Sequence, residues 1–151
     1  MDQRVSIITL GVKDLAKAKG FYEALGWKAA EMPPEEEGNI VAFDLQTMTL
    51  ALYPLDKLDE DTGQAIERKG PPTFTLAYNV ASEKEVDQTL TDAQTCGANI
   101  IKPAEKAFWG GYSGYFTDLD GYYWEVAFNP FAKLGPKGEF QWNGVEISSD
   151  N

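Results

Sequence analysis

A single carboxylate, Glu125, occupies the position in this chain that could best support chemistry. It lies in the segment 123–128, YWEVAF, in which all the remaining side chains are apolar or aromatic. Successive side chains of a β-strand point to opposite faces, so Glu125 shares a face with Tyr123 and Ala127. A carboxylate in such surroundings can pair with a cation or act as a base. Because an unpaired buried charge is costly, Glu125 can equally be a structural residue satisfied by a hydroxyl of Thr75 or of a nearby tyrosine.

Aromatic side chains that precede Glu125 form a second candidate feature. Trp109, Tyr112 and Tyr115 lie in a segment interrupted by glycines. At the mouth of a cleft, such a segment can close over a flat apolar ligand, and tyrosine hydroxyls can orient that ligand. The alternative is that the aromatics belong to the core and that the glycines mark β-bulges. We favour ligand contact for Trp109 and Tyr112, and a core position for Phe116.

The residue types that the chain lacks exclude several reaction classes. The chain has no histidine, the commonest side chain for metal binding and for acid–base catalysis near neutral pH. Serine–histidine and cysteine–histidine mechanisms are therefore excluded. A net charge of −11 argues against nucleic acid as a partner, because phosphate binding needs basic patches. An acidic protein can attract cationic small molecules, although the same charge is typical of simple solubility.

The expected location follows from the absence of targeting features. No apolar run reaches the roughly 18 residues that a membrane-spanning helix needs, so we expect no membrane partner. The first residues lack the apolar region and cleavage site of a signal peptide. A single cysteine, Cys96, cannot form an intrachain disulfide, which fits a reducing compartment. We therefore expect a cytoplasmic protein.

The first part of the chain, residues 1–54, predicts one small module of strands around a helix. Residues 4–12 are β-branched and apolar, which favours a strand. Asp14 is the expected N-cap of a helix that runs to Leu25 and ends at Gly26. Three further strands are expected at residues 27–31, 39–44 and 48–53. Residues 55–72 then predict a linker with a short helix around 62–68.

The second part, residues 73–130, repeats this β-α-β-β-β order. After a strand at 73–80, Ser82 and Glu85 match a capping box for a helix that runs to about Cys96. The remaining strands are expected at 99–102, where Pro103 ends the strand, and in a hairpin of 115–117 with 123–128, connected by Asp120-Gly121. The tail, residues 131–151, is expected to pack loosely on the sheet or at a dimer contact. Its end, Ser148–Asn151, is expected to fray.

Two segments carry a resemblance to a known group of proteins. VKDLAKAKGFYEALGW at 12–27 and YFTDLDGYYWEVAFNP at 115–130 resemble the vicinal oxygen chelate superfamily, which includes glyoxalases, bleomycin-resistance proteins and extradiol dioxygenases. The resemblance covers about residues 4–130. It implies an α+β fold in which two βαβββ modules form a curved eight-stranded mixed sheet around a cleft, and it implies a homodimer. The fold hosts isomerases, dioxygenases, epimerases and drug-sequestering proteins, so it does not settle an activity.

The resemblance also assigns four positions to a metal site. Metal enzymes of this superfamily bind a divalent ion with four side chains, usually His or Glu, and these positions fall on Ile7, Ala51, Thr75 and Glu125. One carboxylate and one weak hydroxyl do not suit Zn²⁺, Ni²⁺ or Fe²⁺. We therefore expect no metal and no cofactor. The same four positions are expected to face a ligand instead.

Two functions from different classes follow. The leading hypothesis is a metal-independent protein that binds a small apolar or aromatic molecule, cationic ones included, for sequestration or transport. The competing hypothesis is a metal-independent isomerase or lyase in which Glu125 transfers a proton, with a tyrosine as partner. A structural dimer with a vestigial cleft is a third interpretation.

Overall fold

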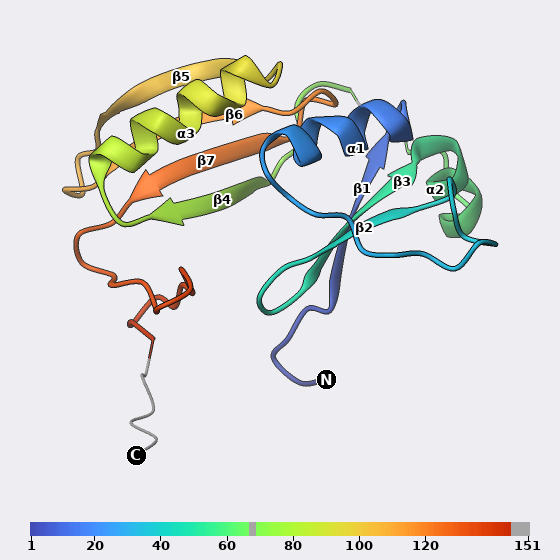
Figure 1. Ribbon diagram of the computed structural model, residues 1–151, viewed down its shortest axis with the longest axis horizontal. Helices are drawn as coiled ribbons and strands as arrows, with labels where there is room; N and C mark the ends of the chain where they lie inside the picture. Colours follow the sequence, from blue (N-terminus) through green and yellow to red (C-terminus); the bar gives the residue numbers. More distant parts are fainter. Residues whose placement is uncertain (67–68, 146–151) are drawn as a thin grey trace. The chain divides into compact units, whose positions relative to one another are not determined.

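The computed structural model describes residues 1–66 and 69–145 (Figure 1). The chain divides into two compact units, Met1–Pro71 and Pro72–Asn151. Both units combine helices with mixed strands, which confirms the expected α+β class. The predicted frayed end, Ser148–Asn151, lies outside the described residues. In the part of the chain that is described, no helix is long and apolar enough to cross a membrane.

The first unit is a three-stranded sheet with a helix on each face. Its strands follow the order β1-β3-β2, in which β1 runs parallel to β3 and β2 runs antiparallel to it. α1 packs against one face through its aromatic side chains, and α2 contacts the other face at Gly11 of β1. The elements of this unit are β1 (Ile7–Val12), α1 (Leu15–Ala24), β2 (Val41–Asp44), β3 (Thr49–Pro54) and α2 (Leu55–Thr62).

The predicted first helix is confirmed, together with the residues that begin and end it. The Asp14 carboxylate accepts a hydrogen bond from the backbone N–H of Lys17 at 3.0 Å, which satisfies one free donor of the first turn. Gly26 follows the helix with φ of 98°, a conformation that glycine adopts without steric cost. Tyr22 projects from α1 into the core, where its ring lies 5.7 Å from that of Phe43 on β2.

The predicted strand at 27–31 is wrong. The segment makes a backbone hydrogen bond to β2, from Ala30 N–H to the Ala42 carbonyl at 2.8 Å, but it forms no ladder. Pro33 and Pro34 follow directly and lack the N–H groups that would extend a ladder. Trp27 is held by aromatic packing instead, with its ring 5.3 Å from that of Tyr22. The described residues therefore form seven strands in two sheets rather than the expected eight.

The short helix of the expected linker lies earlier than predicted. α2 starts directly after β3 and ends at Thr62, where the expected helix was to begin. Gly63 terminates α2 in the left-handed conformation, with φ of 67°. Leu55 and Leu58 fix the position of α2, because they pack against Gly11, where a Cβ atom would lie 2.7 Å from Leu55. Residues 67 and 68 of the expected helix lie outside the described residues.

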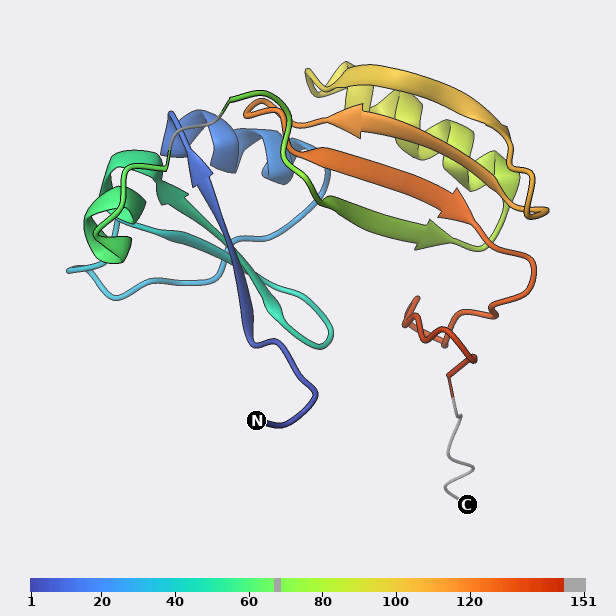
Figure 2. The ribbon, with the colours of Figure 1, turned by 180° about the vertical axis from the view of Figure 1, so that it is seen from behind.

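The second unit is a four-stranded sheet with one helix along one face. Its order is β4-β7-β6-β5, with β4 parallel to β7 and the other pairs antiparallel. α3 lies across the face seen in Figure 1, and Figure 2 shows the sheet from the opposite side, with α3 behind the strands. The elements are β4 (Thr75–Val80), α3 (Glu83–Thr95), β5 (Asn99–Lys106), β6 (Tyr112–Thr117) and β7 (Tyr123–Phe128).

The predicted capping box of α3 is confirmed. The Ser82 hydroxyl accepts the Glu85 backbone N–H at 3.2 Å, and the Glu85 carboxylate reaches back to the backbone N–H of Ala81 at 3.2 Å. The helix buries Val86 and Leu90 against the sheet. Burial of each such side chain contributes on the order of 1.5–3 kcal/mol.

The predicted end of a strand at Pro103 is wrong, because β5 continues to Lys106. Proline is tolerated there for two reasons. β5 is an edge strand, and its pairing with β6 shifts register between Lys102 and Glu105, on either side of Pro103. A proline at a bulge on an edge removes no ladder hydrogen bond.

The predicted hairpin of β6 and β7 is confirmed, although β6 begins earlier, at Tyr112. Gly121 has φ of 81°, as a tight connection requires. The Asp118 carboxylate, 6% exposed, accepts the backbone N–H groups of Asp120 at 3.0 Å and Tyr122 at 2.9 Å. This turn fixes the register that places Glu125 opposite Tyr115.

Candidate functional site

Glu125 lies in the middle of β7, the strand between β4 and β6. Backbone register pairs it with Ala77 on β4 and with Tyr115 on β6. Side chains paired in register project from the same face of a sheet. The adjacent Gly114 projects to the other face, where Leu90 of α3 lies against it. Glu125 and Tyr115 therefore share the face opposite α3, which we call the distal face.

Strand register places the Tyr115 side chain beside the Glu125 carboxylate, and the two groups interact electrostatically. Burial raises the pKa of Tyr115 above its ordinary value, and the Glu125 charge raises that pKa further. At neutral pH Tyr115 is thus protonated and can act as a hydrogen-bond donor beside the carboxylate. This contact supports the interpretation in which a nearby tyrosine satisfies Glu125, and it still leaves a half-buried carboxylate that can accept from a ligand.

Small and hydroxyl-bearing side chains surround the pair on the distal face. Ala77, beside Glu125, is exposed and brings no bulk over the carboxylate. Thr75 lies two residues earlier on β4, projects from the same face and is also exposed. Ser113 lies on β6 and is 6% exposed. Thr75, Tyr115 and Glu125 are thus brought onto one face of the sheet.

The first unit places Ile7 and Ala51 in equivalent positions of its own sheet. The parallel pair β1–β3 matches β4–β7, with Ile7 paired to Thr49 as Thr75 is paired to Tyr123. Ala51 takes the place of Glu125 and is 2% exposed, whereas Ile7 is 57% exposed. These two apolar side chains lack donor atoms, so this sheet offers no polar counterpart to the Glu125 pair at these positions.

Tyr112, a predicted ligand contact, lies on the opposite face from Glu125. Its hydroxyl donates to the Asp87 carboxylate of α3 at 2.9 Å. That hydrogen bond raises the pKa of Tyr112, with burial and the Asp87 charge as further causes. The alternation of β6 separates Tyr112 from Tyr115 by three positions, so the two rings project from opposite faces. Tyr112 therefore connects β6 to α3.

Trp109, the other predicted aromatic contact, lies in the turn between β5 and β6. A Cβ atom on Gly111 would lie 1.8 Å from its indole ring, so the ring packs directly over that glycine. The turn is closed by hydrogen bonds from Ala107 N–H to the Gly111 carbonyl at 2.8 Å and from Gly110 N–H to the Ala107 carbonyl at 3.0 Å. Trp109 is 39% exposed and is held in place by its own loop. Phe116, expected in the core, is buried there at 4% exposure.

A family model for the Glyoxalase/Bleomycin resistance protein/Dioxygenase superfamily matches residues 4–126. The chain belongs to this superfamily. A glyoxalase-related enzyme from Fulvimarina pelagi is 34% identical, with a TM-score of 0.83 over 93% of this chain and 98% of that chain. A hypothetical protein from S. aureus is 25% identical, with a TM-score of 0.73 over 85% and 95%.

The fold also extends to a resistance protein. The fosfomycin resistance protein FosX from Listeria monocytogenes is 23% identical, with a TM-score of 0.65 over 85% of this chain and 95% of that chain. Comparison with curated proteins gave no match. The superfamily and its fold are thus established for this chain, and the chemistry has to be argued from its own residues.

The residues of this superfamily member do not fit the divalent metal that the superfamily implies. The four positions that the resemblance assigns to the metal are Ile7, Ala51, Thr75 and Glu125, and these residues supply one carboxylate and one neutral hydroxyl. Transition-metal sites use several imidazole, thiolate or carboxylate donors. Among residues 1–66 and 69–145, no group of three or more such side chains has a suitable arrangement.

Sequence reasoning missed two neighbours of Glu125 on the distal face. Ala77 and Ser113 have unremarkable residue types, and only strand register brings them beside the carboxylate and Tyr115. A usable signal did exist. The turn at Asp118–Gly121 fixes the β6–β7 register, and counting back from it pairs Glu125 with Tyr115.

The alkaline stability of this superfamily member should depend on Tyr115. A pKa raised on folding contributes stability that is fully present below the unfolded pKa, about 10, and is lost as pH rises through the folded pKa. The free energy of unfolding in urea should be lower at pH 11 than at pH 8 in the wild type, and this decrease should be smaller in Tyr115→Phe. Tyr123→Phe, on the same face, serves as the control. Equal pH dependence in wild type and Tyr115→Phe would contradict the assignment.

Proposed function

We propose that this superfamily member binds a small apolar or aromatic molecule on the distal face of its second sheet, without a metal. In this proposal Glu125 accepts from an ammonium, guanidinium or other donor group of the ligand. The observation that carries it is the strand register, which presents the half-buried Glu125 carboxylate between Tyr115 and the small side chain of Ala77.

Charge and surroundings support a cationic ligand. Hydrogen bonds to an ionised acceptor are about twice as strong as neutral ones, so one carboxylate can dominate the recognition of a small molecule. The net charge of −11 adds a long-range attraction for cations. Tyr115 and Tyr123 offer aromatic surface on the same face, which favours flat ligands and cations. A homodimeric assembly and a cytoplasmic location, expected from the sequence, remain part of this proposal.

A matched ligand panel tests the proposal directly. Aromatic ammonium and guanidinium compounds would be compared with uncharged compounds of the same ring system, with thermal shift and tryptophan fluorescence as readouts. We expect saturable binding of the cationic members. The same titrations with Zn²⁺, Ni²⁺ or Mn²⁺ present should give unchanged dissociation constants.

Two results would count against the proposal. A stoichiometric transition metal in the purified protein, or binding that requires an added metal, would contradict metal independence. Equal affinity for charged and uncharged compounds would contradict the role of Glu125 as the anchor.

One observation favours the competing enzymatic function. An isomerase or lyase needs a second group that can handle a proton near the base, and Tyr115 provides one within hydrogen-bond reach of Glu125. In this alternative Glu125 would abstract a proton and Tyr115 would donate to the developing negative charge of the substrate. We rank it second, because the raised pKa of Tyr115 keeps its proton tightly bound. Substitution of Glu125 by glutamine separates the two functions.

A further inference from the structure

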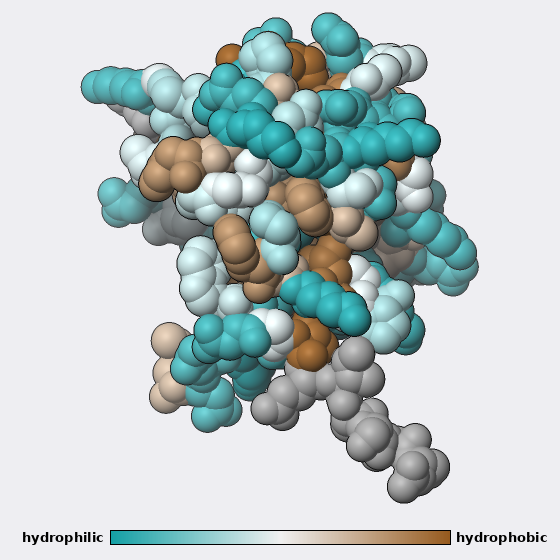
Figure 3. All heavy atoms as spheres, turned by 90° about the vertical axis from the view of Figure 1, so that its left-hand side faces the viewer, coloured by the Kyte–Doolittle hydropathy of each residue, from teal (hydrophilic) through white to brown (hydrophobic). Residues whose placement is uncertain are grey.

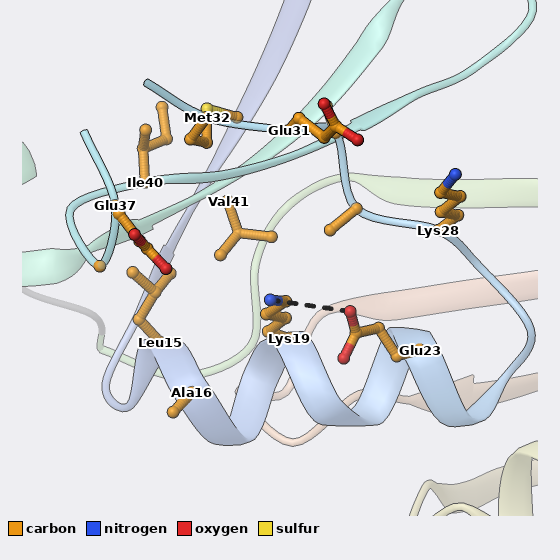
Figure 4. Close-up of a pocket in the computed structure, with 13 residues that line it drawn as sticks. Leu15, Ala16, Lys19, Glu23, Lys28, Glu31, Met32, Glu37, Ile40 and Val41 are labelled. Atoms are coloured by element: carbon orange, nitrogen blue, oxygen red, sulfur yellow. Dashed lines mark ion pairs between the residues drawn. The ribbon is translucent and has the colours of Figure 1, made fainter. Parts of the chain in front are cut away.

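A cavity of about 690 Å³ lies where β4 and β7 end, within the second unit. It is bordered by the ends of these two strands, by the start of α3 and by the segment 129–138 that follows β7. Figure 3 faces this end of the sheet, and hydrophobic side chains gather in the lower half of that view, among hydrophilic ones. The volume falls within the range of small-molecule sites, and Glu125 is not among its lining residues.

The segment 129–138, which borders the cavity, is held in a defined conformation. The backbone N–H of Phe131 donates to the Asn129 side chain at 2.9 Å, and Ala132 is buried at 6% exposure. Further along, Gly135 N–H donates to the Glu139 carbonyl at 2.9 Å, and Lys137 N–H donates to the Glu139 carboxylate at 2.8 Å. The cavity wall on this side is therefore built from hydrogen-bonded turns.

The apolar part of the wall suits a flat or branched apolar group. It includes two aromatic rings, a leucine and two prolines, whose side chains offer rigid surface at little entropic cost. These residues are Tyr78, Phe128, Leu134, Pro130 and Pro136.

The charged groups of the wall are one carboxylate, Glu85, and one ammonium, Lys133. Glu85 is engaged locally, because its carboxylate accepts from the Ala81 N–H at 3.2 Å and from the Ser82 hydroxyl at 3.0 Å. Lys133 makes no ion pair with the residues that the structure describes. The Asn79 amide, also in the wall, makes no hydrogen bond within the same described part of the chain. The cavity thus offers an ammonium and an amide donor beside apolar surface.

We infer that this cavity binds a small carboxylate with an aromatic or branched apolar body. The carboxylate pairs with Lys133 and accepts from the Asn79 amide, and the apolar body lies against Tyr78 and Phe128. The inference goes beyond the proposed function, because it concerns a different place and a ligand of opposite charge. In a protein of net charge −11, an anion needs such a local cation to overcome the general repulsion.

The inference is tested with benzoate, 2-naphthoate and indole-3-acetate, measured by titration calorimetry on the full chain. Uncharged alcohols with the same rings serve as matched ligands. We expect saturable binding of at least one carboxylate and at least tenfold weaker binding of its alcohol. Lys133→Gln should weaken carboxylate binding about tenfold, since a charged hydrogen-bond partner is lost. Lys84→Gln removes an exposed charge outside the cavity wall and should leave binding unchanged.

Amide chemical shifts locate the ligand and separate this site from the distal face. Carboxylate titration should shift the amides of Asn79 and of residues 129–138, and Glu125→Gln should bind the carboxylate as the wild type does. The inference is overturned if none of the three carboxylates binds saturably, if acid and alcohol bind equally, or if Lys133→Gln binds as tightly as Lys84→Gln. It is also overturned if Glu125→Gln abolishes carboxylate binding.

Discussion

Substitution of Glu125 by glutamine is expected to weaken the binding of cationic aromatic ligands by about 10- to 100-fold. The amide has the size of the carboxylate and retains an oxygen that can accept from the Tyr115 hydroxyl, so the sheet should fold as before. What is lost is the negative charge, and a hydrogen bond to a charged group is worth about 1.5–3 kcal/mol. Dissociation constants from tryptophan fluorescence, measured at low and moderate salt, would give the effect.

A matched variant separates this local effect from that of net charge. Glu83→Gln removes one carboxylate from α3, which covers the other face of the same sheet. Its ion pair with Lys106 is exposed, so its loss should change ligand affinity and stability little. If both variants bind equally well, Glu125 does not anchor the ligand.

The same variant also separates the two candidate functions. In a binding protein, Glu125→Gln changes affinity, and bound ligand is recovered chemically unchanged from wild type and variant alike. In an isomerase or lyase, the wild type converts the bound compound and Glu125→Gln stops turnover while retaining part of the affinity. Conversion of a panel compound by the wild type, absent in the variant, would replace our first proposal by the second.

Substitution of Gly114 by alanine is expected to destabilise the second unit by about 1–3 kcal/mol, the range for overpacking of a close-packed site. A Cβ atom there would lie 2.7 Å from the Leu90 side chain, 2.9 Å from the Ala104 nitrogen and 2.9 Å from the Lys102 carbonyl oxygen. Two of these atoms belong to the backbone of β5 and cannot rotate away. Urea unfolding followed by circular dichroism would measure the loss.

Glycine at position 20 provides the opposite expectation. It lies within α1, is exposed, and a Cβ atom there would meet nothing within 4 Å. Gly20→Ala should therefore stabilise the first unit by about 0.5–1 kcal/mol through better helix propensity and lower unfolded-state entropy. If Gly114→Ala did not destabilise the protein, the close approach of the β5 backbone to Gly114 would be contradicted.

Local chemistry explains why much of the fold follows from the sequence. Asp14 and Ser82 cap helices through contacts within four residues, and the glycines at 26 and 121 end or turn the chain through their own backbone freedom. Such signals involve neighbours along the chain, so residue types alone reveal them. The segment at 27–31 shows the limit, because its residues suit a strand but form almost no ladder.

Prediction of the candidate site needed both the sequence and the tertiary structure. The sequence by itself determined that Glu125 is an isolated carboxylate among apolar residues and that histidine is absent. Only the tertiary structure decided that Ala77 lies beside Glu125, because the pairing of β4 with β7 joins strands that are far apart in the sequence. A shift of one residue in that pairing would exchange the faces, and a single sequence without the folded sheet does not contain the register of distant strands.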